Sequence, residues 1–240
     1  AVPAEALRGV DAVINLAGEP VASGRWTEKK KKLIRDTRVE GTRALVDAVQ
    51  AQGSSVQVFV QGSAMGIYGN RGEETLDAAS SIGTGFLADV VRDWEAEAAK
   101  LERLPVSFVR TSMVLARHGG ALSEMLPLFR ANVAGRLGLT GEQWVSWIHL
   151  SDIANLFIHA VDAKFRGVLE GTAPEPVRNR EFTDVLCREL GVIQNVPVPG
   201  VVLKVLYGEM ASVILEGQKV MATATLASGF KFEFPKVDAA

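Results

Sequence analysis

The chain has 240 residues, of which 48% are hydrophobic and 22% charged, and these proportions describe an ordinary globular protein with a sizeable core. Its formal net charge of −2 gives no electrostatic reason to expect nucleic acid or an anionic membrane as the main partner. The single cysteine, Cys187, excludes an internal disulfide and a cysteine-rich zinc site, and we expect it in the core. No apolar run approaches the roughly 18 residues of a transmembrane helix.

Predicted strands and helices alternate along the chain. In chain order they are strand 11–18, helix 27–52, strand 56–64, helix 86–101, strand 106–115, helix 121–133, strand 144–150, helix 152–162, strand 167–173 and helix 179–190. Thr27, either Ser151 or Asp152, and Asn179 are the expected N-caps. From residue 196 we expect a proline-punctuated segment, a helix and a β-like tail over 229–235. This alternation predicts a doubly wound α/β fold with a parallel sheet.

A glycine-spaced segment, GIYGNRG, occupies residues 66–72 directly after the apolar run VQVFV. Its G-x-x-G-x-x-G spacing raises the question of a phosphate-binding loop. Such a loop must lead straight into a helix, whose N-terminus supplies amide donors and a favourable dipole. Here the acidic, turn-rich stretch EETLDAASSIGTG follows instead. We therefore interpret the segment as a loop that leaves the carboxyl end of a central strand, which is still where open α/β sheets place ligands.

Several longer motifs point to one family. They are DAVINLAGEP, RWTEKKKKLIRDTRVEGTRALVDAV, GSAMGIYG, FLADVVRDWE, GGALSEMLPLFR, WVSWIHLSD, APEPVRNREF and LEGQKV followed by GFKFEFP. Together they resemble the atypical extended short-chain dehydrogenase/reductases, and more narrowly the SulA-like epimerase-family proteins of bacteria and plastids, over essentially the whole chain. The resemblance implies an NAD(P)-binding Rossmann-like domain over 1–170 and a smaller α+β lobe on the substrate side over 171–240. It also implies NADP(H) as cofactor and the cytoplasm or the plastid stroma as location.

The chain departs from this family at its beginning. Family members open with a strand and a T-G-G-T-G-F-I-G type loop, and nothing in the sequence corresponds to it. We expect the chain to start just before the fourth strand of the fold, with roughly 50 residues of βαβ structure preceding that point in the family. Residues 11–18 would then form an open, apolar sheet edge that further residues or a protein partner must cover. Dinucleotide binding by residues 1–240 alone is expected to be weak.

The second departure concerns catalysis. Short-chain reductases use a Tyr-x-x-x-Lys pair, in which the lysine lowers the pKa of the tyrosine so that the hydroxyl exchanges a proton with substrate. The two tyrosines, Tyr68 and Tyr207, are followed at this spacing by Gly72 and Ala211. Two hypotheses follow. The chain is either an NADP(H)-binding oxidoreductase or epimerase-like enzyme with unconventional residues, or a catalytically decayed protein that serves as a scaffold or assembly component of a larger complex.

The resemblance places small or apolar residues at strand ends, together with one cation, on the cofactor side. These candidates are Leu16, Ala17, Gly18, Arg38, Ser63 and Val114. Arg38 is expected to meet a cofactor phosphate, with a solvated helix charge as the alternative. For Leu16–Gly18 the alternative is a tight turn, and for Val114 it is core packing. Residues 29–32, four lysines in a first helical turn, are assigned to a solvated face.

Catalytic and substrate-side candidates come from the same resemblance. Ser63 matches the serine that holds a substrate carbonyl, although a local hydrogen bond is the alternative. Tyr68 is either a substitute acid or a packed side chain. Trp144, Trp147 and His149 match the family's W-I-H-x-x-D segment on the substrate side, where His149 is either a base oriented by Asp152 or a satisfied histidine at a helix start. We predict a small-molecule substrate and no metal site.

Overall fold

A parallel sheet of four strands forms the centre of the molecule. The computed structural model describes residues 2–52, 55–193 and 197–240. The main sheet has the order β1-β2-β4-β8, and each neighbouring pair in it is parallel. Among the described residues β1 has a single neighbour and therefore forms one edge of the sheet. The strands are β1 (Ala12–Asn15), β2 (Val58–Ala64), β4 (Val106–Thr111) and β8 (Gly167–Gly171).

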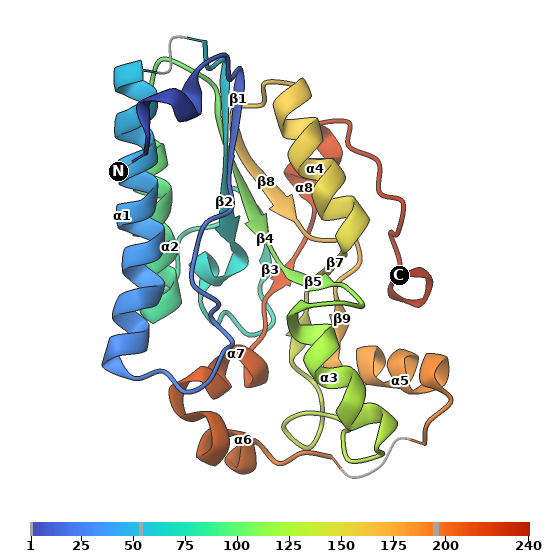
Figure 1. The fold of residues 1–240 in the computed structure, drawn as a ribbon. Helices are drawn as coiled ribbons and strands as arrows, with labels where there is room; N and C mark the ends of the chain where they lie inside the picture. The colour runs from blue at the N-terminus through green and yellow to red at the C-terminus, as the bar shows by residue number, and fades with distance from the viewer. Residues whose placement is uncertain (1, 53–54, 194–196) are drawn as a thin grey trace.

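Helices cover both faces of this sheet. In Figure 1, α1 (Glu28–Gln52) and α2 (Phe86–Ala98) lie on one side, and α4 (Leu150–Asp162) and α8 (Thr223–Ala227) lie on the other. Parallel strands covered on both faces by helices make a doubly wound, Rossmann-like architecture. The predicted α/β fold class is confirmed.

The core is divided by the alternation of side chains along the strands. Successive residues of a strand point to opposite faces of the sheet. Phe59 accordingly packs toward α1 and α2, in a cluster with Val46 and Ala98. Its neighbours Val58 and Val60 pack toward α4, in the other main cluster. The two layers thus hold the sheet from both sides.

Most of the remaining elements lie beyond the carboxyl ends of the main strands, which point toward α3, α6 and α7 in Figure 1, whereas η1 precedes β1 and lies near its amino end. The short helices are η1 (Ala4–Leu7), η2 (Met65–Tyr68), α3 (Gly120–Arg130), α5 (Asn179–Leu190), α6 (Gly200–Tyr207), η3 (Gly208–Met210), α7 (Ala211–Leu215) and η4 (Val237–Ala239). The short strands are β3 (Thr75–Leu76), β5 (Met113–Leu115), β6 (Trp144–Val145), β7 (Trp147–His149), β9 (Val177–Arg178) and β10 (Lys219–Val220). Ligands of open α/β sheets bind at this end of the fold.

The glycine-spaced segment is a turn and not a phosphate loop. It forms η2 and then leads to β3, which pairs with β10, so no helix follows it directly. Gly69 has a φ of +62°, and a Cβ there would lie 2.8 Å from the carbonyl oxygen of Thr84. Glycine is therefore required by both the backbone conformation and the close approach. The interpretation of this segment as a loop after a central strand is confirmed.

The expected strand over 106–115 is broken at Ser112. Its amide and hydroxyl both donate to the carbonyl of Gly171, at 2.9 and 2.8 Å. From Met113 onward the chain leaves β8 and pairs as β5 with β7. A single apolar run thus serves two sheets, because the chain changes its hydrogen-bonding partner at one residue.

Thr27 caps α1 as predicted, since its Oγ1 accepts the amide of Lys30 at 3.2 Å. The other two cap predictions are wrong. His149 caps α4, its Nδ1 accepting the amide of Ser151 at 3.2 Å. Asn179 is the first residue of α5, and its Oδ1 accepts the amide of Leu137 at 2.9 Å instead of an amide of its own helix. Asp152 and Asn179 do not cap their helices because their side chains accept amides of distant segments, at residues 233–234 and 137.

The C-terminal tail is not a strand, contrary to expectation. Residues 229–235 run without strand pairing, and the buried carboxylate of Asp152 accepts the amides of Glu233 and Phe234 at 2.8 and 3.0 Å. A side chain therefore satisfies the backbone groups that a neighbouring strand would otherwise satisfy. Phe230 and Phe232 pack edge to face, with ring centroids 5.0 Å apart, and both lie against the core on the α4 side.

The C-terminal segment contacts the region around residues 144–149 at several points. The His149 and Phe234 rings lie 3.9 Å apart, and the hydroxyl of Ser146 donates to the carbonyl of Gln218 at 2.8 Å. α8 also returns to the main sheet, where the amide of Thr225 donates to the buried carboxylate of Glu170 at 3.0 Å. The division into a domain over 1–170 and a lobe over 171–240 stays a prediction.

Candidate functional site

The turn after β1 lies at the carboxyl edge of the sheet. Asn15, the last residue of β1, pairs with Gln61, and the next residue, Leu16, passes Gly62 so closely that a Cβ on Gly62 would lie 3.2 Å from Leu16 Cδ2. Leu16, Ala17 and Gly18 are all exposed. A tight, exposed turn of small residues at a strand end leaves backbone that a ligand can approach.

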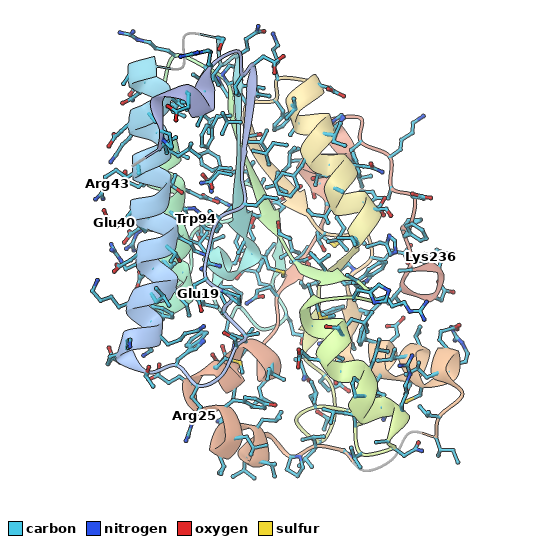
Figure 2. All side chains as sticks on the ribbon, in the orientation of Figure 1. Glu19, Arg25, Glu40, Arg43, Trp94 and Lys236 are labelled. Carbon is cyan, nitrogen blue, oxygen red and sulfur yellow. The ribbon has the colours of Figure 1, made fainter. Side chains whose placement is uncertain are left out.

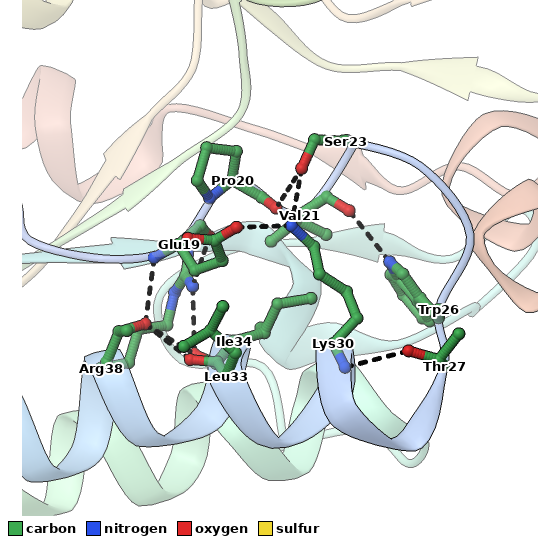
Figure 3. Close-up of polar contacts among 11 residues, drawn as sticks. Glu19, Pro20, Val21, Ser23, Trp26, Thr27, Lys30, Leu33, Ile34 and Arg38 are labelled. Carbon is green, nitrogen blue, oxygen red and sulfur yellow. Dashed lines mark hydrogen bonds and ion pairs between the residues drawn. The ribbon is translucent and has the colours of Figure 1, made fainter.

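Arg38 on α1 lies against this turn (Figure 3). Its Nη1 donates to the carbonyls of Glu19 and Ile34, at 2.8 and 3.2 Å, and its Cζ lies 5.1 Å from the ring centroid of Trp94. A Cβ on Gly18 would lie 2.9 Å from Arg38 Cζ, so a larger residue at this position would displace the guanidinium. Burial lowers the pKa of Arg38, while the charge of Glu19 opposes that effect. An arginine side chain nevertheless keeps its proton in a protein, so this edge of the sheet carries a fixed, half-buried cation.

The loop between β1 and α1 folds back on the helix. Figure 3 shows Lys30 reaching into this loop, where its Nζ donates to Glu19 Oε1 and Ser23 Oγ, each at 2.6 Å. Trp26 Nε1 donates to the carbonyl of Val21 at 2.9 Å. The side chain of Lys30 is 15% exposed and that of Lys31 is 18% exposed. The prediction of a fully solvated lysine face is wrong for these two residues, because carboxylates of neighbouring segments draw them in.

A buried chain of hydrogen bonds supports both the turn and Arg38. Thr42 Oγ1 accepts Trp94 Nε1 and Asn15 Nδ2, each at 2.8 Å. Asn15 Oδ1 in turn accepts the amide of Ala17 at 3.2 Å. The ring on which Arg38 stacks is therefore connected to the backbone of the exposed turn through side chains that are at most 5% exposed. Such a network holds its members in one arrangement.

Ser63 belongs to a second buried network. Its hydroxyl donates to Glu95 Oε1 at 2.5 Å. Arg110 binds both oxygens of Glu95 at 2.9 Å through Nε and Nη2, and its Nη1 donates to the hydroxyl of Tyr68 at 3.1 Å. Burial opposes the charge of Arg110, but the hydrogen bonds and charge of Glu95 prevail and raise the pKa of the guanidinium. The guanidinium thus keeps its proton, and Ser63 donates its hydroxyl proton to Glu95.

This network corrects two catalytic candidates. The hydroxyl proton of Ser63 is held by Glu95, so it does not point to a substrate carbonyl. Tyr68 has no exposed surface, and burial raises the pKa of its phenol more than the hydrogen bond from Arg110 lowers it. A buried phenol with a raised pKa is a packed, neutral side chain and a poor proton exchanger. Ser63 therefore has the structural role of a hydrogen-bond donor, and Tyr68 that of a packed core side chain.

Trp144 is held between charged side chains at the surface. The Arg178 guanidinium lies 3.8 Å and the Lys219 ammonium 4.9 Å from its ring centroid. Its Nε1 donates to Glu73 Oε2 at 3.1 Å, and Arg178 binds both oxygens of Glu73 at 2.9 and 2.6 Å. These hydrogen bonds, first that of Arg178, lower the pKa of Glu73 to about 2. The cluster joins the glycine-containing turn to the β6–β9 ribbon.

Trp147 and His149 lie in different surroundings. Trp147 has no exposed surface, and its Nε1 donates to the carbonyl of Glu175 at 3.1 Å, so the prediction that it lines a substrate surface is wrong. His149 is half-buried at the end of β7 and stacks on Phe234. Because Nδ1 accepts the amide of Ser151, the ring proton lies on Nε2. Asp152 contacts the tail, so it does not orient His149.

Val114 and Cys187 are placed in the core. Val114 is half-buried against the cluster on the α4 side, which favours the packing alternative for this residue. Cys187 is 6% exposed, and burial raises the pKa of its thiol. Among the described residues no three His, Cys, Asp or Glu side chains are placed to hold a metal ion. No helix in the described ranges is long and apolar enough to cross a membrane.

Two surface hollows lie away from the β1 turn. The larger, of about 530 Å³, lies between α5 and residues 236–238 and is lined mainly by charged side chains. The smaller, of about 220 Å³, borders the Trp144 cluster and residues 215–217. Neither includes Arg38 or residues 16–18.

Comparison with known protein families identifies the family of the chain. The model of the NAD dependent epimerase/dehydratase family matches residues 3–171. The chain belongs to this family. A model described as a domain of unknown function matches residues 198–240. The resemblance to extended short-chain dehydrogenase/reductases with such a C-terminal domain is thereby confirmed.

Individual members of the epimerase/dehydratase family match over most of the chain. A chloroplastic epimerase family protein of Arabidopsis thaliana is 38% identical over 239 residues, which are 96% of this chain and 67% of that protein. The crystal structure of a human epimerase family protein with NADPH has a TM-score of 0.90 at 34% identity and covers 96% of this chain and 80% of its own. A nucleoside-diphosphate sugar epimerase structure from Corynebacterium glutamicum has a TM-score of 0.79 at 31% identity, covering 99% of this chain and 46% of that one.

Sequence reasoning missed the residues that hold this site of the epimerase/dehydratase fold together. Glu95 and Arg110 form the central ion pair, and Trp94 carries Arg38. One signal was available, because Arg110 interrupts the apolar strand VSFVRTS, and a charge inside a buried strand requires a partner. The sequence did not identify Glu95 as that partner, because Glu95 lies on an amphipathic helix that carries other charged residues as well.

Proposed function

We propose that the chain is an NADP(H)-binding protein of the epimerase/reductase type that acts on a small molecule without a Tyr-x-x-x-Lys pair. The observation that carries this proposal is the half-buried Arg38, which stacks on Trp94 beside an exposed turn at the carboxyl edge of a parallel sheet. A cation and accessible backbone at this edge are what a dinucleotide phosphate requires. The NADPH complex of the human relative supports the choice of cofactor.

The described residues fit one side of such a cofactor. The backbone of Leu16–Gly18 would pass the nucleotide, and Arg38 would hold a phosphate through the guanidinium nitrogens that do not bind Glu19 or Ile34. The cofactor itself supplies hydride transfer. On the substrate side, we assign His149 the role of a hydrogen-bond donor through Nε2–H. Trp144 is covered by Arg178 and Lys219 and would present these cations to a substrate. Ser63 and Tyr68 have no part in proton exchange, because both are enclosed.

The affinity of this half-site is limited. One charge-assisted hydrogen bond contributes about 1.5–3 kcal/mol. Micromolar affinity corresponds to about 8 kcal/mol. We therefore expect residues 1–240 to bind NADPH more weakly than micromolar, with Arg38 responsible for most of the phosphate contribution. Further residues or a protein partner against β1, where Ile14 is 42% and Leu16 63% exposed, would raise it.

NMR titration of the chain with NADPH and with NADH tests this proposal, because chemical shifts report weak binding. Shifts confined to residues 16–18 and α1 are expected, and Arg38→Gln should remove them. Arg35→Gln is the matched control, since Arg35 lies on the same helix but pairs with Asp93. If Arg38→Gln removes the chemical-shift changes equally for NADPH and NADH, Arg38 binds the pyrophosphate. If it removes them for NADPH alone, Arg38 binds the 2′-phosphate. Shifts elsewhere, or micromolar binding that survives Arg38→Gln, would show that the cofactor site is misplaced.

Turnover would be tested separately, by absorbance at the reduced nicotinamide band with a panel of carbonyl and sugar-nucleotide substrates. A chain that binds NADPH but turns over nothing would favour the non-catalytic hypothesis. By the same likeness to bacterial and plastid family members, we propose the cytoplasm or the plastid stroma as the location.

A further inference from the structure

An apolar face without a partner in the described structure lies on α6. Val201 and Val205 are 67% and 68% exposed, Leu206 is 57% exposed and Val202 is 43% exposed. Their spacing, two adjacent residues repeated after four, places them on one side of the helix. We call these four residues the α6 face. Contiguous exposed apolar surface of this kind marks an interaction site in most proteins.

The fold holds this face outward. Leu203, on the opposite side of the helix, is 7% exposed, and a Cβ on Gly200 would lie 3.3 Å from the side chain of Leu215 on α7. α6 is thus seated on α7 by Leu203 and by the close approach at Gly200. In Figure 1 the helix lies at the end of the molecule, beyond the carboxyl ends of the strands. The side chains of the α6 face therefore pack against no other element among the described residues.

Cations border the α6 face. Lys204 is exposed on α6 itself. A Cβ on Gly208, the residue after α6, would lie 3.5 Å from Arg25 Nε, and Figure 2 shows Arg25 at the same end of the molecule. Lys31 forms an ion pair with Glu209 in η3, which brings the first turn of α1 against the segment that follows α6.

The same turn of α1 carries the exposed Lys29 and Lys32, and the acids there are fewer. Glu209 is paired with Lys31, Lys32 pairs with Asp36, and Glu28 is exposed within 3.6 Å of Lys31. Counting Arg25, residues 28–32 and Lys204 together with the acids that pair with them, Glu19, Asp36 and Glu209, six cations stand against four acids. The overall charge of −2 does not describe this surface, because charges more than about 10 Å away are screened.

We propose that the α6 face docks on an anionic lipid bilayer, with α6 lying in the plane of the interface. An apolar helix face bordered by lysine and arginine is the pattern of interfacial membrane binding, in which burial of the side chains and attraction to anionic headgroups act together. The face is entirely aliphatic, whereas protein interfaces draw on tryptophan, tyrosine and arginine at their centres. The contact is peripheral.

Co-sedimentation with phospholipid vesicles tests the proposal on the whole chain. Vesicles of phosphatidylcholine alone are compared with vesicles that contain about 30% phosphatidylglycerol, at about 0.1 M salt. Binding to the anionic vesicles should be at least about fivefold stronger, since each basic residue near such a surface contributes about that factor. Val205→Asp should weaken this binding at least about tenfold, because it removes buried apolar area and adds a repelled charge. Lys204→Glu should reduce the anionic preference and leave binding to neutral vesicles unchanged.

Ile158→Asp is the matched control. Ile158 is 53% exposed on α4, on the other side of the molecule, and its replacement should change vesicle binding less than about twofold. Unfolding curves check that the variants at Val205, Lys204 and Ile158 are folded, which we expect because all three side chains are exposed. No binding by the wild type, equal binding to neutral and anionic vesicles, or full binding by Val205→Asp would overturn the proposal. A dimer in light scattering that Val205→Asp dissociates would also overturn it, by assigning the face to self-association.

Discussion

Arg110 on β4 and Glu95 on α2 form a two-point ion pair, with side chains 8% and 13% exposed and both N–O distances at 2.9 Å. The pair fastens a strand of the main sheet to the helix that covers it. It also holds the hydroxyls of Ser63 and Tyr68, which enter from β2 and η2. The four side chains thus tie β2, η2, α2 and β4 into one buried network.

Removal of Arg110 should destabilise the protein strongly. Arg110→Met leaves the Glu95 carboxylate buried without its cation, which costs about 3–5 kcal/mol in comparable cases. Chemical denaturation measures this loss in the free energy of unfolding. The double variant Arg110→Met with Glu95→Leu should recover a large part, because no charge is then left unpaired. Arg103→Met, at an exposed position, is the control, and a loss below about 1 kcal/mol for Arg110→Met would contradict the structural role.

The carboxylate of Glu170 should be equally hard to replace. Oε1 accepts the amides of Ala78 and Ala224 at 2.8 and 3.3 Å, and Oε2 accepts the amide and hydroxyl of Thr225 at 3.0 and 3.2 Å. In Glu170→Gln one of these oxygens becomes an NH₂ group that cannot accept, so the loss should be about 1–3 kcal/mol.

Hydrogen exchange locates this effect. Faster exchange is expected at the amides of Ala78, Ala224 or Thr225, according to which side the new NH₂ group occupies. Glu175→Gln, at an exposed position, should change neither stability nor exchange. Unaltered exchange at all three amides in Glu170→Gln would show that the carboxylate does not hold α8 on the sheet.

The Glu73–Arg178 contact should depend on pH in one direction. The pKa of Glu73 is lowered from 4.5 to about 2, so its stabilising contribution is complete above the higher value and is lost as the pH falls toward the lower one. A carboxyl-carbon NMR titration should place the midpoint of Glu73 near 2 in the wild type. Arg178→Gln removes the largest cause of the shift and should move the midpoint back toward the ordinary value. A wild-type midpoint near 4.5 would mean that the cluster around Trp144 is open in solution.

Two glycines should respond in opposite directions to alanine. A Cβ on Gly41, inside α1, would meet nothing within 4 Å, so Gly41→Ala should stabilise the protein by about 0.5–1 kcal/mol through a lower backbone entropy of unfolding. Gly69 has a φ of +62° and leaves no room for a Cβ, so Gly69→Ala should destabilise it by at least about 1 kcal/mol. Denaturation midpoints measure both. A loss of stability in Gly41→Ala would contradict the open space beside that position.

For much of the site region the sequence predicted where a residue lies relative to a strand, but not the direction in which its side chain points. The sequence placed Leu16–Gly18 and Ser63 at the ends of expected strands and Tyr68 in the loop after one; in the structure Ser63 lies within β2, whereas Leu16–Gly18 follow β1 and Tyr68 ends η2. The sequence could not tell that Ser63 and Tyr68 turn under α2, because the face that a strand residue occupies depends on register against neighbours distant in sequence. The same limit applies to Trp147, whose motif was matched correctly although its ring lies in the core.

The sequence by itself determined the α/β alternation, the helix start at Thr27, the turn at Gly69 and the family, because these follow from short-range periodicity, capping, glycine geometry and motif order. Tertiary structure alone decided the remainder. The break at Ser112, the tail held by Asp152 and the Glu95–Arg110 pair each depend on a partner more than ten residues away. A buried polar group must find a hydrogen-bond partner. Which partner it finds depends on how segments distant in sequence pack together, and this cannot be predicted from the local sequence.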